Sequence, residues 1–161
     1  MGRVLQSPAA LELKPGERAV FLAGSIEKGR AVAWQVEAAA ALADLEGVAV
    51  LNPRRDDWDD GWAQSIEEPR FRAQVEWELS AQERADVIAM YFAPETRAPV
   101  TLLELGLAAR GGKLVVCCPA GFWRKGNVEV VAARYGVEVA HDLGALVARV
   151  RRRLGAGAAG A

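Results

Sequence analysis

Short apolar runs alternate with longer, mostly polar or Ala-rich segments along the 161 residues of the chain. Each apolar run is three to six residues long and is followed by Gly, Pro or polar residues. Buried strands of a parallel sheet have this continuous apolar character. The predicted strands are residues 19–23, 48–51, 87–92, 114–118 and 137–139.

The segments between these runs are predicted to be helices. Residues 31–45 are rich in Ala, Leu and Glu, contain no internal Gly or Pro, and are followed by Gly47, which is the composition of a helix and its C-terminal stop. A second helix is predicted to end near residue 85. The remaining predicted helices are residues 101–110, 127–135 and 142–154.

Strands and helices that alternate at this spacing predict an α/β fold. We expect a single-domain, flavodoxin-like (Rossmann-like) three-layer sandwich with a five-stranded parallel sheet in the order 2-1-3-4-5. Residues 1–18 are interpreted as a lead-in, residues 19–154 as the domain and residues 155–161 as a flexible tail. In such a sheet, ligands bind beyond the carboxyl ends of the strands, at the switch between strands one and three.

The net charge and the cysteines of the chain indicate which kinds of partner and which cellular setting to expect. Twenty basic and twenty-one acidic residues give a net charge of −1, which argues against a nucleic-acid binder. No apolar run reaches the roughly 20 residues of a membrane helix. The cysteines, Cys117 and Cys118, are adjacent in a predicted strand and point to opposite faces, which favours a reduced, cytoplasmic setting. We therefore expect a soluble cytoplasmic protein that binds a small molecule.

The loop after the first predicted strand, residues 24–30, is a candidate ligand loop. Its backbone amides and the Ser25 hydroxyl could hold a phosphate or sugar oxygen. The loop matches neither the Walker nor the dinucleotide glycine pattern. The alternative is a turn permitted by Gly24, with Ser25 capping the next helix.

Glu104 is predicted in the first turn of the helix at residues 101–110, at the ligand edge of the sheet. Backbone N–H groups and the helix dipole would favour an ionised carboxylate there, which is the state needed to attack carbon. The alternative is structural, because Thr101-x-x-Glu104 also matches a capping box.

Glu78 is the second candidate. Phe71 and Val75 place it on the apolar side of its predicted helix, and a carboxylate that turns inward needs a partner or a chemical role. Two carboxyl groups near one ligand can divide the work, one as an ionised nucleophile and one as a protonated acid. Glycosyl transfer uses this division.

Three motifs in this order resemble the nucleoside 2-deoxyribosyltransferase superfamily, which includes the deoxynucleoside monophosphate N-glycosidases. They are residues 21–26, residues 85–88, which include Asp86, and Glu104-Leu105-Gly106, and the likeness extends over about residues 20–138. It implies cleavage or exchange of the N-glycosidic bond of a (deoxy)nucleoside through a covalent glycosyl-Glu104 intermediate, with no cofactor or metal. Glu78, eight residues before Asp86, stands where the family has an Asp that protonates the base.

The resemblance also implies the partners. Asn127 follows Glu104 at the spacing of a family Asn that a neighbouring subunit donates to the sugar. A homodimer or higher homo-oligomer with shared sites and a nucleoside or nucleotide ligand is therefore expected. The candidate substrate-binding residues are Gly24, Ser25, Ile26, Asn52, Arg54, Arg55, Trp58, Thr101 and Asn127.

The chain also departs from the family pattern. Ala98 stands where several transferases carry a second Asp for the base, and Pro99, Val100 and Thr101 replace the Ser and small residues of the monophosphate glycosidases. Alternative functions are therefore a nucleoside 5′-monophosphate N-glycosidase, a non-catalytic nucleotide-binding or sensing module, and an enzyme acting on a dinucleotide.

The long polar segment at residues 52–69 carries further candidates. Arg54 or Arg55 could bind a phosphate bidentately, and a tryptophan could stack on a base. The tryptophans considered are Trp58, Trp62 and Trp123, and packing in the core or an interface is an equally good explanation for each. Four aspartates at residues 56–60 are interpreted as a solvated loop rather than a metal site.

Overall fold

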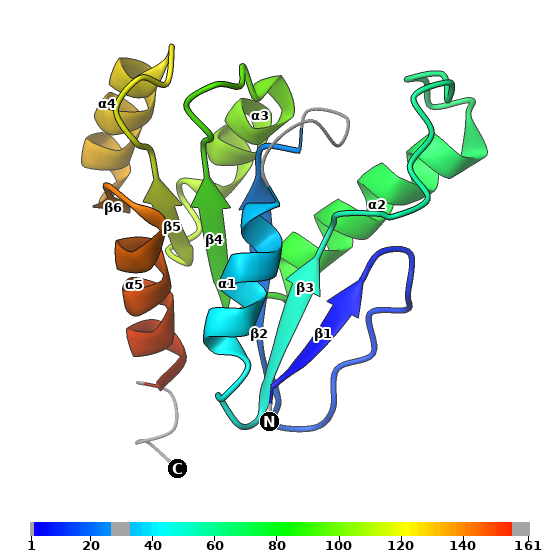
Figure 1. Ribbon diagram of the computed structural model, residues 1–161, viewed down its shortest axis with the longest axis horizontal. Coiled ribbons are helices and arrows are strands. Elements are labelled where there is room, and N and C mark those ends of the chain that lie inside the picture. The colour runs from blue at the N-terminus through cyan, green and yellow to red at the C-terminus, as the bar shows by residue number, and fades with distance from the viewer. Residues whose placement is uncertain (1, 27–32, 156–161) are drawn as a thin grey trace.

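The computed structural model describes residues 2–26 and 33–155, which form one parallel α/β sandwich (Figure 1). The strands are β1 (Arg3–Gln6), β2 (Arg18–Gly24), β3 (Val48–Asn52), β4 (Val87–Tyr91), β5 (Leu114–Cys117) and β6 (Glu138–Ala140). The helices are α1 (Trp34–Leu42), α2 (Pro69–Arg84), α3 (Pro99–Ala108), α4 (Lys125–Tyr135) and α5 (Leu143–Gly155). None of the helices in these ranges is long and apolar enough to cross a membrane.

The described residues form a six-stranded sheet in the order β1-β3-β2-β4-β5-β6, and all neighbouring strands are parallel. The predicted five strands in the order 2-1-3-4-5 are therefore wrong in number and in order. The difference comes from β1, which lies in the segment interpreted as a lead-in and adds an edge strand outside β3. The switch between β2 and β4, where the chain order reverses, remains at the centre of the sheet.

The edge position of β1 explains why its sequence did not reveal it. The four residues Arg3 to Gln6 contain one apolar pair flanked by polar side chains, and none of the four is fully buried. Their backbone pairs with β3 from Arg3 opposite Ala49 to Gln6 opposite Asn52, and Arg3 also binds the Glu17 carboxylate at 2.7 Å. An edge strand needs no continuous apolar run, because one long side of it faces solvent.

Helices cover both faces of the sheet. On one face, apolar residues of α2, α3 and α4 pack on the sheet, among them Ala81, Leu105 and Val128. On the other face, α1 and α5 contribute Trp34 and Leu146 to a second apolar cluster. Figure 1 shows α1 and α5 in front of the sheet and the other three helices behind it. This arrangement confirms the predicted parallel α/β sandwich.

Several helix boundaries differ from the predictions, and those of α1 and α3 matter for the site. Helix α1 spans Trp34–Leu42, which is shorter than the predicted 31–45, and residues 31 and 32 lie outside the described residues. Helix α3 begins at Pro99 rather than at residue 101. Pro fits this first position because its missing N–H would have no helical partner there. The earlier start changes the placement of Glu104, as described below.

Gly24 is required where β2 ends. A Cβ atom built there would lie 2.5 Å from Trp34 Cζ2 and 2.5 Å from the Tyr91 carbonyl oxygen. The Trp34 indole also donates to the Ser25 carbonyl oxygen at 3.3 Å. The glycine therefore permits close packing of α1 and β4 against the end of β2, whatever ligand binds nearby. The rest of the predicted ligand loop, residues 27–30, and the predicted tail beyond Gly155 lie outside the described residues.

Candidate active site

A cavity of about 310 Å³ opens beyond the carboxyl ends of the central strands. It lies at the β2–β4 switch, where ligands bind in open parallel sheets. Helix α2 lines it with Phe71, Gln74, Val75 and Glu78, and the start of α3 lines it with Ala98, Pro99, Val100, Thr101 and Glu104. The loops after β2 and β3 contribute Gly24, Ser25, Ile26, Pro53, Arg54, Arg55 and Trp58. The cavity thus brings together most of the predicted site residues.

Glu104 lies in the second turn of α3, not in the first. The N-cap of α3 is Ala98, an alanine with a left-handed backbone (φ 46°, ψ 54°), and Pro99 is the first helical residue. The alternative of a Thr101–Glu104 capping box is therefore wrong, because Thr101 is already inside the helix. The Glu104 side chain is buried, with 7% of its surface exposed, and it lines the cavity.

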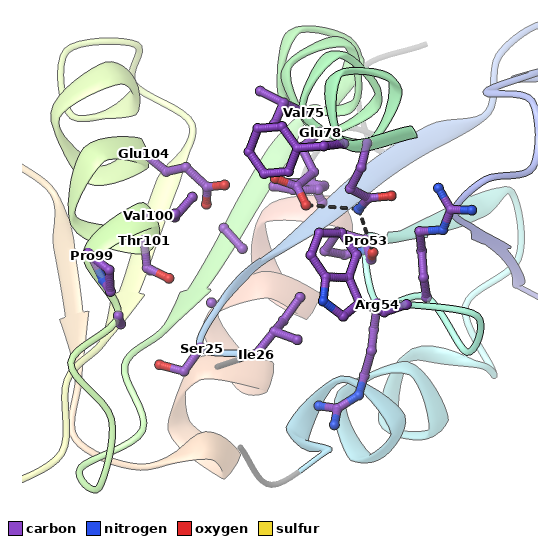
Figure 2. Close-up of a pocket in the computed structure, with 18 of the residues that line it drawn as sticks. Ser25, Ile26, Pro53, Arg54, Val75, Glu78, Pro99, Val100, Thr101 and Glu104 are labelled. Carbon is purple, nitrogen blue, oxygen red and sulfur yellow. Dashed lines mark hydrogen bonds between the residues drawn. The ribbon is translucent and has the colours of Figure 1, made fainter. Parts of the chain in front are cut away.

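Glu78 reaches the same cavity from α2. The two helices lie on the same face of the sheet, and Figure 2 shows the carboxyl groups of Glu78 and Glu104 pointing toward one another across the cavity. Glu78 is half-buried, and it forms part of the cavity wall. Two acidic side chains from two helices thus face one another in the cavity.

Burial controls the ionisation of both acids. It raises the pKa of Glu104 to about 8, and the charge of Glu78 adds to this rise. Burial also raises the pKa of Glu78 to about 7, against a hydrogen bond from Gln74 that lowers it. The expectation that the helix dipole keeps Glu104 ionised does not hold in the free protein, because the dipole acts mainly on the first turn and Glu104 lies in the second. Near neutral pH the pair therefore retains protons that exposed carboxylates would have lost.

Gln74 holds the Glu78 carboxyl group in place. Its amide nitrogen donates to Glu78 Oε1 at 2.9 Å and to the Pro53 carbonyl oxygen at 2.8 Å. Its own oxygen accepts a hydrogen bond from the Ser7 hydroxyl at 2.5 Å. Gln74 and Ser7 are both buried, and Figure 2 marks the two donations from the amide with dashed lines.

Sequence reasoning missed Gln74 and Ser7. One signal for Gln74 was available, since it lies four residues before Glu78 and therefore on the same helical face. No local signal exists for Ser7, which is 67 residues away from Gln74 in the sequence. Its contact depends on the position of β1, which the sequence pattern did not reveal.

Ser25 ties two loops together at the cavity wall. Its hydroxyl oxygen accepts a hydrogen bond from the Ala93 backbone N–H at 3.1 Å and lies 2.8 Å from the Thr96 hydroxyl oxygen. Ser25 does not cap α1, because the N-cap of that helix is Ala33. Ser25 therefore fixes the loop after β2 against the loop after β4, and it lines the cavity from there.

The loop after β3 is ordered by arginine and tryptophan contacts. Arg55 binds the Asp57 carboxylate through two hydrogen bonds of 2.8 Å, and its guanidinium lies 5.0 Å from the centre of the Trp62 ring. Trp62 also packs edge-on against Trp58 at 5.1 Å. Arg54 lines the cavity beside Arg55. These contacts agree with the packing explanation for Trp62.

Four of the candidate residues do not line the cavity of this chain. Trp62 is buried beneath the guanidinium groups of Arg55 and Arg70. Asn52 is buried and accepts a hydrogen bond from the Arg54 backbone N–H at 3.0 Å, so it shapes the loop. Asn127 is exposed on α4. Trp123 is half exposed and packs between the guanidinium groups of Arg97 and Arg124.

The fold and the cavity define the class to which the protein belongs. It is an α/β domain that holds two facing acidic side chains at the carboxyl ends of the central strands. The chain belongs to the nucleoside 2-deoxyribosyltransferase-like family, whose model matches residues 17–122, more than half of its length. The matched segment contains both acids and the whole cavity wall, which indicates a glycosyltransferase-like enzyme with a small-molecule ligand. A search of curated protein sequences finds no match to the chain.

Proposed function

We propose that the protein cleaves or exchanges the N-glycosidic bond of (deoxy)nucleosides. Glu104 attacks C1′ as a carboxylate, while Glu78 gives its proton to the departing base. The electron pair of the C1′–N bond leaves with the base, and a C1′–O bond to Glu104 forms in its place. A second base, or water, then attacks C1′ and gives its proton to the Glu78 carboxylate, while the C1′–O bond breaks and releases Glu104 as a carboxylate.

One observation carries this proposal: the two acids face one another across a single cavity and interact electrostatically. The reaction needs one ionised and one protonated carboxyl group, so the productive enzyme holds one proton on the pair. Burial raises the pKa of both acids, so the free protein retains protons on the pair near neutral pH. In the transition state, positive charge develops at the anomeric carbon beside Glu104 and the base nitrogen accepts the Glu78 proton, which favours the form with Glu104 ionised.

The pH dependence of kcat/KM tests the shared proton. With pKa values of about 7 and about 8 for Glu78 and Glu104, the singly protonated pair is most abundant between these values. We expect a bell-shaped profile with its maximum in that interval. A rate that keeps rising through pH 10 would contradict a protonated acid in the pair.

Turnover by a panel of deoxynucleosides in the presence of free adenine tests the reaction itself. Formation of deoxyadenosine indicates transfer, and free deoxyribose without a new nucleoside indicates hydrolysis. Glu104→Gln should lower kcat by at least about 10³-fold, because an amide cannot form the glycosyl ester. A Glu104→Gln variant with wild-type turnover would refute Glu104 as the nucleophile.

Hydrolysis of nucleoside 5′-monophosphates is the second candidate. The observation that favours it is the placement of Arg54 and Arg55 in the cavity wall, since guanidinium groups bind phosphate well. Arg55 already binds Asp57, so a phosphate would have to compete for it. Faster base release from a 5′-monophosphate than from its nucleoside would favour this candidate over transfer.

A nucleotide-binding module without turnover is the third candidate. Ala98 motivates it, because it stands in the cavity wall where several transferases carry a second acid. Calorimetry would then show nucleotide binding while no base is released. Trapping of a sugar adduct on Glu104 would exclude the module.

A further inference from the structure

Gln74 is buried in the cavity wall, yet no step of the proposed reaction uses it. Its two amide hydrogens are both committed, one to the Pro53 carbonyl oxygen and one to Glu78 Oε1. Its carbonyl oxygen accepts the Ser7 hydroxyl hydrogen. An amide with this set of partners has only one favourable orientation, because a flip would place its oxygen against the Pro53 carbonyl oxygen.

The fixed orientation determines how Glu78 can hold a proton. Gln74 presents an N–H group to Oε1, so Oε1 acts as an acceptor and cannot also direct a proton at that nitrogen. When Glu78 is protonated, the proton therefore resides on Oε2. When the proton leaves, the amide dipole is already oriented toward the new carboxylate and stabilises its charge without rearrangement.

We propose that Gln74, held by Ser7 and the Pro53 carbonyl, is a positioning residue that assigns the acid proton of Glu78 to Oε2 and stabilises the carboxylate left after proton transfer. The catalytic meaning of this role rests on the proposed function, in which Glu78 protonates the base. The chain of contacts links the residue that follows β1 to the acid, from Ser7 to Gln74 to Glu78.

Among the residues that the structure describes, the other groups in the cavity wall near this carboxyl group can be named. Glu104 faces it from α3, and Arg54 and Arg55 line the cavity from the loop after β3. The residues of the loop after β2 in the cavity wall are Gly24, Ser25 and Ile26, which do not titrate near neutral pH. Loss of the Gln74 donor should therefore move the titration of Glu78 in one direction, toward higher pH.

The test compares two buried glutamines of the same helix. Gln74→Met removes the donor with little change in volume, and Gln82→Met is the matched control, because Gln82 is also buried on α2 but its amide nitrogen has no hydrogen-bond partner among the described residues. The carboxyl carbon of Glu78 is followed by NMR on glutamate-labelled protein over a pH titration, with its signal assigned through Glu78→Gln. Thermal unfolding of each variant verifies that it folds.

We expect Gln74→Met to raise the titration midpoint of Glu78 by about 0.5 to 1 pH unit and Gln82→Met to leave it unchanged. Ser7→Ala should shift it in the same direction by less, and it provides a second test should Gln74→Met fold poorly. An unchanged midpoint in Gln74→Met, or an equal shift in Gln82→Met, would overturn the role of Gln74.

Kinetics add the catalytic readout. Gln74→Met should lower kcat by about tenfold or more with a smaller change in KM, and move the alkaline limb of the pH profile upward, since an acid with a misplaced proton transfers it less efficiently. No turnover by the wild-type protein would defeat the proposed function, while the NMR titration decides separately whether Gln74 controls Glu78. The two failures are therefore distinguishable.

Discussion

At the scale of single residues, Glu104 and Glu78 show what the burial of a carboxyl group costs in stability. The charged form of a carboxyl group in the cavity wall loses hydration. Both pKa values therefore lie above the ordinary glutamate value of 4.5.

The raised pKa values predict how stability varies with pH. A group whose folded pKa is raised binds more protons in the folded than in the unfolded protein, so the free energy of unfolding falls as pH rises from the unfolded to the folded pKa. For this pair the interval runs from 4.5 to about 7 for Glu78 and to about 8 for Glu104. We expect urea unfolding to show a loss of at least about 1.4 kcal/mol between pH 5 and pH 8, the equivalent of one pKa unit.

The Glu78→Gln, Glu104→Gln double variant isolates this contribution. Its free energy of unfolding should vary less between pH 5 and pH 8 than that of the wild-type protein, because two titrating groups are gone. At pH 8 the double variant should be the more stable protein. An identical slope in both proteins would show that other groups govern the pH dependence.

At the scale of secondary-structure elements, the packing of α1 and β4 against the end of β2 leaves no room for a side chain at Gly24. Gly24→Ala would place a methyl group 2.5 Å from both the Trp34 ring and the Tyr91 carbonyl oxygen. We expect a loss of about 1–3 kcal/mol in the free energy of unfolding from overpacking. Gly106→Ala in α3 is the control, because a Cβ there meets nothing within 4 Å. That change should be neutral or stabilising by up to about 1 kcal/mol, since Ala favours a helix over Gly.

The elements that the sequence predicted are those with a strong apolar signal. The central strands read as continuous apolar runs because both of their faces are covered by helices. The edge strand β1 is polar on both sides of a single apolar pair and gave no such signal. The start of α3 was misplaced for a different reason. Pro99 is a residue type common in loops, yet it is the first residue of the helix.

The sequence pointed to the two acidic residues of the candidate site, but not to the residues that hold Glu78 in place. Glu78 was singled out because a charged residue in an apolar pattern is conspicuous, and Glu104 because its predicted helix begins at the ligand edge of the sheet. Gln74 and Ser7 were missed because glutamine and serine are common on surfaces, and only the folded chain brings them together. A polar contact between residues so far apart in the sequence depends on where β1 lies in the sheet, which the local pattern of apolar residues did not reveal.

At the scale of the whole molecule, Asn127 raises the question of assembly. It is exposed on α4 and does not line the cavity formed by its own chain. The proposal that it serves a neighbouring subunit's site therefore leads to a complementation experiment. Glu104→Gln and Asn127→Ala should each abolish most activity when assayed alone.

Mixing these two variants should restore activity if sites are shared in a homodimer. Each mixed dimer then has one site with both native residues and one site with neither. Statistical reassociation gives about one quarter of wild-type activity in a two-fold dimer. Activity that stays at the level of the separate variants would contradict a contribution from a neighbouring subunit.

The hydrogen bond from Ser7 has a consequence for where this protein can diverge from its relatives. The family match begins at residue 17, so Ser7, which binds the Gln74 amide, lies before the matched segment. If Gln74 has the proposed role, changes in these first residues would alter proton transfer without touching any group in the cavity wall. A version trimmed to the matched segment would keep both acids and Gln74 and yet lose the hydroxyl group that holds the Gln74 amide.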